Sequence, residues 1–111
     1  MLSPVALECD HVPDLHHARA KLRSGHYPVV LTEAGLPDGS WLDVLSMVRG
    51  ITPGAEVIVT DRDADARFWA EVLNLGGYDM LAQPFHESEV RRILSNACSR
   101  SQVRGAGHRA L

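Results

Sequence analysis

The chain has 111 residues, a length that fits one domain, and 45% of them are hydrophobic, which is enough for a packed core. Its net charge of −3, without a long basic block, argues against a nucleic-acid-binding surface. No apolar stretch reaches the roughly 18 residues of a membrane helix and no signal peptide is visible, so we expect a cytoplasmic protein without a membrane partner. Cys9 and Cys98 follow no ligand-like spacing and are expected to be buried free thiols.

Short apolar runs alternate with amphipathic runs along the chain. Four apolar runs predict strands: 4–9, 27–32, 55–60 and 79–82. Four amphipathic runs predict helices: 13–25, 40–50, 63–77 and 87–98. Ser40 with Asp43 resembles a capping box at the start of the second helix. The pattern is lost after residue 100, so we expect a domain of residues 1–100 and a flexible tail of residues 101–111.

This alternation of strands and helices indicates one architecture. It predicts a parallel sheet with right-handed crossovers and helices on both faces, a three-layer α/β/α sandwich of about four βα units. The working site of such a fold lies beyond the carboxyl ends of the strands. Four segments of this chain lie there: 8–10, 33–38, 60–63 and 83–85.

Three segments at predicted strand ends carry a family resemblance. They are VVLTEAGLPDGSW, VIVTDRD and YDMLAQPF. In this order and spacing they resemble the receiver domain of bacterial response regulators, the CheY-like family, over about residues 5–98. The resemblance implies a flavodoxin-like (CheY-like) fold and a role in phosphorelay or two-component signal transduction. It also implies a phosphoacceptor aspartate, an acidic pair that helps to hold Mg²⁺, a hydroxyl residue, a lysine and an aromatic residue.

Carried over residue by residue, the resemblance retains one polar site residue. Thr60 stands at the hydroxyl position. Glu33 replaces the phosphoacceptor aspartate, Gln83 the lysine and Met80 the aromatic residue. The longer side chain of glutamate moves its carboxylate outward by about 1.5 Å, enough to spoil in-line attack, and glutamine cannot neutralise phosphoryl charge. The resemblance keeps the family's turn at Pro84 and Phe85, and Pro37, Asp38 and Gly39 form another turn, for which Asp38 and Gly39 are suited by their own chemistry.

The resemblance covers four units where the family has five. In one interpretation, which we favour, run 4–9 is the family's second strand, and the first unit is absent with its acidic pair. In the other, run 4–9 is the first strand, Glu8 and Asp10 are a degraded acidic pair, and the second unit is deleted. The family's first strand lies between its second and third strands. Its loss would require these two to close the gap, borrow a strand from another chain, or leave backbone groups unpaired.

Other polar residues have structural explanations. Glu33 is expected to be a plain strand-end carboxylate, with a fixed imitation of the phosphorylated state as the alternative. Asp61 and Asp63 are expected to cap the following helix. His16 and His17 are adjacent, so they point in different directions on a helix and do not form a chelating pair.

The departures from the family pattern imply a phosphorylation-independent pseudo-receiver, a bacterial protein-interaction module that is not an enzyme and needs no cofactor. A complete Mg²⁺ site is not expected, because hard cations need several oxygen ligands. Its partners would be signalling proteins or a second copy, bound through a face made by residues 64–98 with Trp69, Met80 and Arg91 as interaction residues. The alternatives are a residual phosphoacceptor with Mg²⁺-dependent phosphotransfer, an N-terminally truncated non-functional receiver, and a small-molecule binder such as a flavoprotein.

Overall fold

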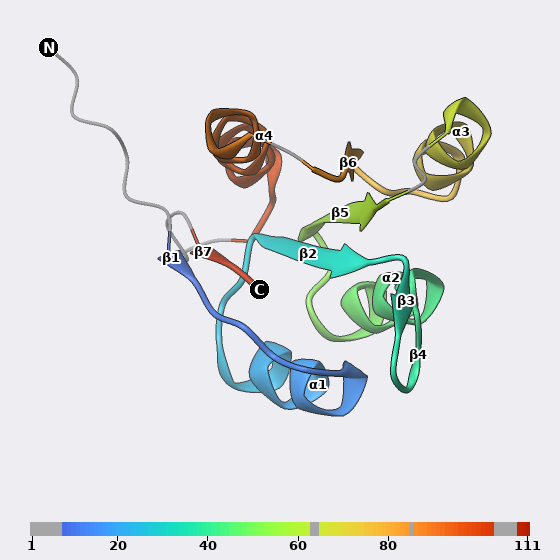
Figure 1. Cartoon of the computed structure of the whole chain (residues 1–111). Coiled ribbons are helices and arrows are strands. Elements are labelled where there is room, and N and C mark those ends of the chain that lie inside the picture. Colours follow the sequence, from blue (N-terminus) through green and yellow to red (C-terminus); the bar gives the residue numbers. More distant parts are fainter. Residues whose placement is uncertain (1–7, 63–64, 85, 104–108) are drawn as a thin grey trace, which may run out of the picture.

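The computed structural model describes residues 8–62, 65–84, 86–103 and 109–111, and Figure 1 shows how its elements are arranged. The helices are α1 (Leu15–Ser24), α2 (Trp41–Ile51), α3 (Ala66–Asn74) and α4 (Glu87–Arg100). The strands are β1 (Glu8–Cys9), β2 (Val29–Glu33), β3 (Gly35–Leu36), β4 (Gly39–Ser40), β5 (Glu56–Asp61), β6 (Asp79–Ala82) and β7 (Arg109–Ala110). Five strands form one parallel sheet in the order β1-β7-β2-β5-β6, and β3 and β4 form a small antiparallel hairpin.

Helices cover both faces of the sheet, so the predicted three-layer sandwich is confirmed. Helices α1, α2 and α3 share one hydrophobic cluster, which includes Trp41, Val59 and Val72. Helix α4 packs on the opposite face, where Leu94 joins a second cluster with Ile58 of β5 (Figure 1). The apolar runs of β2 and β5 are buried because side chains on both sides of these strands meet a helix layer.

The starts of the helices follow from local sequence, with one correction. The capping box of α2 is confirmed, since the Ser40 N–H donates to the Asp43 carboxylate and the Leu42 N–H donates to the Ser40 hydroxyl. For α3 the predicted caps are not the observed one. The cap is Asp65, which accepts from the N–H of the residue three positions on, whereas Asp61 accepts from its neighbour's N–H. Residue 63 lies outside the described residues.

The C-terminal segment differs most from expectation. Residues 109–111 are not a flexible tail, because Arg109–Ala110 form β7 in the interior of the sheet. The Leu111 N–H donates to the Val29 carbonyl at 2.9 Å, and the Leu31 N–H donates to the Leu111 carbonyl at 2.6 Å. The Ala110 and Leu111 side chains are buried. Residues 104–108 lie outside the described part of the chain.

Strand β7 fills the place in the sheet that the pattern of four strand–helix units left unassigned. Strand β1 lies at the edge of the sheet, the place of the family's second strand in the interpretation we favoured. Strand β7 lies between β1 and β2 and pairs with both of them. The chain's own C-terminal end therefore supplies the inner strand, a solution that differs from all three predicted ones.

The two cysteines lie in different surroundings. Cys98 is buried as predicted, whereas Cys9 on β1 is exposed, so the expectation was wrong for Cys9. Burial raises the pKa of the Cys98 thiol, with a smaller contribution from Cys9. Partial burial raises the pKa of the Cys9 thiol too, and the neighbouring Asp10 charge adds to that rise. Both thiols are therefore mainly protonated at neutral pH.

Candidate functional site

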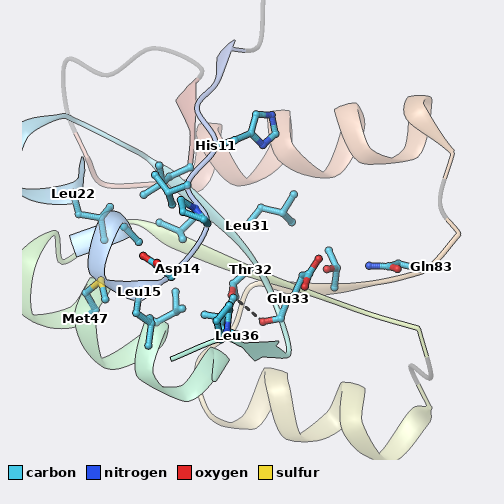
Figure 2. A pocket seen from close by; sticks show the side chains of 18 residues that line it. His11, Asp14, Leu15, Leu22, Leu31, Thr32, Glu33, Leu36, Met47 and Gln83 are labelled. Carbon is cyan, nitrogen blue, oxygen red and sulfur yellow. Dashed lines mark hydrogen bonds between the residues drawn. The ribbon is translucent and has the colours of Figure 1, made fainter. Parts of the chain in front are cut away.

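The predicted site residues meet at the carboxyl ends of three adjacent strands. Glu33 ends β2 and pairs in register with Thr60 of β5. Gln83 follows β6, and its N–H donates to the Asp61 carbonyl at 2.9 Å, so this turn is fixed to the end of β5. Figure 2 shows Glu33 and Gln83 toward the same end of a pocket that both residues line. The sheet register therefore brings together the three positions that the sequence singled out.

These three side chains differ in exposure and make no direct pair. Glu33 is exposed, Gln83 is half-buried, and Thr60 is buried. Within the described ranges no hydrogen bond joins these side chains, and no ion pair involves Glu33. Among the described residues, the side-chain hydrogen bond at this strand end runs from the Thr32 hydroxyl to the Glu33 carbonyl, at 2.9 Å (Figure 2). The Glu33 carboxylate thus faces solvent without a cation from the described part of the chain.

The pocket beside Glu33 has a volume of about 520 Å³. This lies within the usual size range of small-ligand sites. Its walls come mainly from apolar side chains of α1, α2 and β2, and its polar groups gather near the strand ends. Leu111 forms part of the wall, so the C-terminal end of the chain helps to shape the cavity. The main apolar side chains of the lining are Leu15, Leu22, Val30, Leu36, Val44 and Met47.

The turn after β2 has a role that the sequence did not reveal. Pro37 and Asp38 connect β3 to β4, and both Asp38 carboxylate oxygens accept from the start of α1. The donors are the Leu15 N–H at 2.9 Å and the His16 N–H at 3.2 Å. Asp38 thereby satisfies backbone donors that a helix start leaves free, in addition to the N-cap. No signal in the sequence predicts this contact, because 23 positions separate Asp38 from Leu15.

Two further turn positions are defined by geometry. A Cβ atom at Gly39 would collide with the Leu15 and Asp43 side chains, so this turn needs glycine for close approach. The bond between Gln83 and Pro84 is cis. Residue 85, which the resemblance includes in this turn, lies outside the described residues.

Helix α1 carries one more acidic contact at the edge of the pocket. Asp14 is its N-cap and accepts from the backbone N–H of His17 at 2.9 Å and from its ring Nδ1 at 2.6 Å. These bonds, led by the backbone one, lower the pKa of Asp14. His17 is thus used locally on the surface, and the ring of its neighbour His16 lies edge-on to it, with 5.6 Å between the ring centroids and 89° between the ring planes.

The face made by residues 64–98 has a groove of its own, with a volume of about 460 Å³. Trp69 lines it with a side chain that is 48% exposed, and its ring N–H donates to Asp79 at 3.2 Å. Met80 lines the same groove but is half-buried against the core. Arg91 is exposed and makes a 3.5 Å ion pair with Glu87 outside the groove lining. The residues 64 and 85 of this face lie outside the described chain.

In residues 8–62, 65–84, 86–103 and 109–111, no group of three or more His, Cys, Asp or Glu side chains is placed to hold a metal ion. Over the same ranges, none of the helices combines the length and the apolar character needed to cross a membrane.

Comparisons with known proteins place the fold. No protein-family model and no curated protein matches the chain. Among solved structures, the signal receiver domain of a putative Luxo repressor protein from Vibrio parahaemolyticus matches with a TM-score of 0.73 and 21% identity, over 82% of this chain and 70% of that one. The receiver domain of the Francisella response regulator 1452 matches with a TM-score of 0.69 and 21% identity, over 78% and 72%.

A third structure comes from a different kind of signalling protein. The receiver domain of the sensor histidine kinase PA1611 from Pseudomonas aeruginosa, which has a magnesium ion coordinated in its active site cleft, matches with a TM-score of 0.67 and 23% identity, over 79% and 74%. Identities of 21–23% bear on the fold alone. Sheet order, helix layers and these likenesses agree, and we conclude that the chain has the flavodoxin-like α/β fold of response regulator receiver domains.

Proposed function

We propose that the chain is a phosphorylation-independent pseudo-receiver that acts as a protein-interaction module in bacterial two-component signalling. The observation that carries this proposal is the state of the strand-end site. Glu33 stands exposed there without a cation from the described residues, and the neighbouring amide of Gln83 has no charge to offer. Phosphoryl transfer depends on positive groups that offset the charge developing on the phosphate oxygens.

Metal binding is the other requirement of that chemistry. Mg²⁺ is held by carboxylates and water in near-octahedral geometry. Around Glu33 the described carboxylates have other partners: Asp38 accepts from the start of α1 and Asp14 from His17. This supports a module that works without Mg²⁺. A fixed carboxylate at the position of a phosphorylated aspartate also fits a constitutive signalling state.

The exposed surface of α3 supports an interaction role. Trp69, Leu73 and Leu75 are all more than 40% exposed, although large apolar side chains on a soluble domain are usually covered. Tryptophan is enriched among residues that dominate binding energy at interfaces. A receiver domain of known structure, that of beryllofluoride-activated NtrC4, is a dimer. We propose that this chain binds a signalling protein or a second copy through the groove at Trp69.

The chemical half of the proposal is tested by incubating the protein with a small phosphodonor and Mg²⁺ and measuring its intact mass. We expect no stoichiometric phosphoryl adduct on the natural chain or on the Glu33→Gln control. The double variant Glu33→Asp with Gln83→Lys shows whether the backbone can still support the reaction. Stoichiometric phosphorylation of the natural chain at Glu33 would instead identify a residual phosphoacceptor.

The interaction half is tested by self-association. Light scattering across a concentration series measures the dimer dissociation constant for the natural chain, Trp69→Ala and the control Leu42→Ala, whose side chain on α2 is similarly exposed at 45%. Loss of a central tryptophan costs at least about 2 kcal/mol, roughly a 30-fold weaker dimer, whereas Leu42→Ala changes little. If the natural chain is monomeric, the same pair of variants is compared on a bound signalling partner. Equal effects of the two substitutions would contradict this choice of face.

A further inference from the structure

The groove at Trp69 presents an aromatic ring that is held in place by a hydrogen bond. Strand β6 is the edge strand of the sheet, and Figure 1 shows it between α3 and α4. The Trp69 ring N–H donates to Asp79 of β6 at 3.2 Å, while 48% of the Trp69 side chain stays exposed. Of the aromatic side chains, tryptophan attracts a cation most strongly. The ring therefore offers a surface on which a positive group can stack.

The charged side chains around this ring are mostly acidic. Asp65, Asp79 and Glu89 line the groove, and among the described lining residues Arg92 is the one cation, so their formal charge is 1 − 3 = −2. Within the described chain, Arg92 forms no ion pair with any of the three carboxylates. Asp65 precedes Trp69 by one turn as the cap of α3, and Glu89 lies in the first turn of α4. The groove therefore attracts a positive group from both helices.

Hydrogen bonds within the chain leave part of this acidic lining available. The Asp79 carboxylate also accepts from the Met80 N–H at 2.7 Å, so this backbone donor of the edge strand is not available to an added strand. One oxygen of the Asp65 carboxylate accepts from the Phe68 N–H at 2.7 Å. Glu89 is exposed and has no ion-pair partner among the described residues. The chemistry left for a partner is thus an indole ring with carboxylate oxygens beside it.

We propose that this groove takes an arginine side chain from a basic segment of the partner protein, an inference that rests on the interaction role proposed above. The guanidinium plane stacks on the Trp69 ring and donates hydrogen bonds to the Glu89 carboxylate, and the Asp65 charge adds to the attraction. Arginine fits better than lysine, because its planar group stacks on aromatic rings and holds its N–H donors in a fixed fork. Leu73, one turn beyond Trp69 and 42% exposed, would contact an apolar residue beside the arginine.

The test uses the whole chain and the acetylated, amidated peptide Leu-Ala-Arg-Ala-Leu as a probe. NMR follows the Trp69 indole N–H at peptide concentrations up to about 2 mM, with the indole N–H of the buried Trp41 as internal control. We expect a saturable shift of the Trp69 signal alone. The same peptide with citrulline, which has nearly the shape of arginine without its charge, should bind about tenfold more weakly. A lysine peptide should bind about threefold more weakly.

Charge variants of the groove provide matched controls. Glu89→Gln removes a carboxylate from the groove and should weaken the arginine peptide about threefold. Glu87→Gln, in the same helical turn but outside the groove lining, should change little. Asp65→Asn should also weaken binding, and it keeps a residue type that caps helices well. Arg92→Gln removes the like charge and should tighten binding about twofold, whereas a groove built for an acidic segment would lose binding.

The outcomes separate this inference from the interaction role on which it rests. Equal binding of the arginine and citrulline peptides, no saturable shift at the highest concentration, or equal effects of Glu89→Gln and Glu87→Gln overturn the arginine proposal. A shift of the Trp69 signal with protein concentration in the absence of peptide also overturns it, because a second copy would then fill the groove. In each case the interaction role stands if Trp69→Ala weakens self-association or partner binding, and it falls if Trp69→Ala has no effect.

Discussion

The two sides of β2 are built very differently. On one side, β2 pairs with β5 over five residues, from Val29↔Glu56 to Glu33↔Thr60. On the other side, its register with β7 is a single pair, Val29↔Ala110, extended by the bonds of Leu111. The first pairing closes a continuous strand–helix–strand unit, whereas the second brings together residues that lie 81 positions apart in the sequence (110 − 29). Local sequence therefore determines the β5 side of β2. The β7 side depends on a few contacts between residues far apart in the sequence, and forming these contacts costs more loop-closure entropy.

The largest expected effect comes from placing a charge on β7, the side of β2 with the shorter pairing. Ala110 is 2% exposed in a cluster with Val29 and Ile58, so Ala110→Asp would bury a carboxylate without a partner. We expect unfolding by urea to show a loss of at least about 3 kcal/mol. Ala20→Asp, at an exposed site, should change stability by no more than about 0.5 kcal/mol. Similar small effects for both variants would show that β7 does not belong to the folded core.

Truncation of one side chain on each side of β2 compares the two halves directly. Ile58 of β5 is 0% exposed, and Leu111 is 8% exposed at the wall of the pocket. We expect Ile58→Ala to lower the free energy of unfolding by about 4 kcal/mol and Leu111→Ala by about 2 kcal/mol, because a site at a cavity edge relaxes more easily. Urea titrations of both variants measure this ratio. A Leu111→Ala effect near zero would mean that the β7 side contributes nothing to stability.

The contrast also explains what the sequence could predict of the fold. The strand and helix runs between residues 13 and 100 carry their own periodicity, and the capping box of Ser40 marks a helix start within four residues. Strand β7 has only two residues and follows a glycine-containing polar stretch, so no pattern distinguishes it from a tail. Its burial is decided by a place between β1 and β2 that exists only in three dimensions. Sequence patterns indicate local structural preference, and they do not indicate an open position between two strands of a sheet.

The candidate site shows the same division. Because strands of a parallel sheet end at one edge, the sequence could place Glu33, Thr60 and Gln83 together, and the register confirms that placement. It could not predict that Asp38 would bond to the start of α1, since that contact depends on how the hairpin folds back. Sequence patterns predicted Asp61 and Asp63 as caps of α3 and missed Asp65, because aspartates alternate through 61–65 and only the position of the helix start selects one of them.

Removal of a helix cap tests the β5 side of β2 with a smaller expected effect on stability. Helix α2 connects β2 to β5, and Ser40 accepts from the Leu42 N–H at its start. We expect Ser40→Ala to cost about 1 kcal/mol in urea unfolding, because a backbone donor loses its partner. Ser46→Ala, at an exposed position inside the same helix, should change stability by only a few tenths of that amount. Equal losses of stability for the two substitutions would mean that packing alone positions α2. The capping box would then contribute little to the β5 side of the sheet.

The smallest expected effect concerns Glu56, which begins the β5 side of the pairing. Partial burial raises its pKa, and the Arg100 charge opposes that rise. With a folded pKa above the unfolded value of about 4.3, the folded state binds more protons in the window between the two values, so stability falls as pH rises through it. Glu56→Gln should therefore be slightly more stable than the natural chain at pH 7, and the gain should disappear below the unfolded pKa. Urea titrations at pH 7 and at a pH below the unfolded pKa measure the difference in free energy of unfolding between the variant and the natural chain. A less stable variant at pH 7 would show that attraction to Arg100 outweighs burial, and that α4 helps to hold the start of β5 electrostatically.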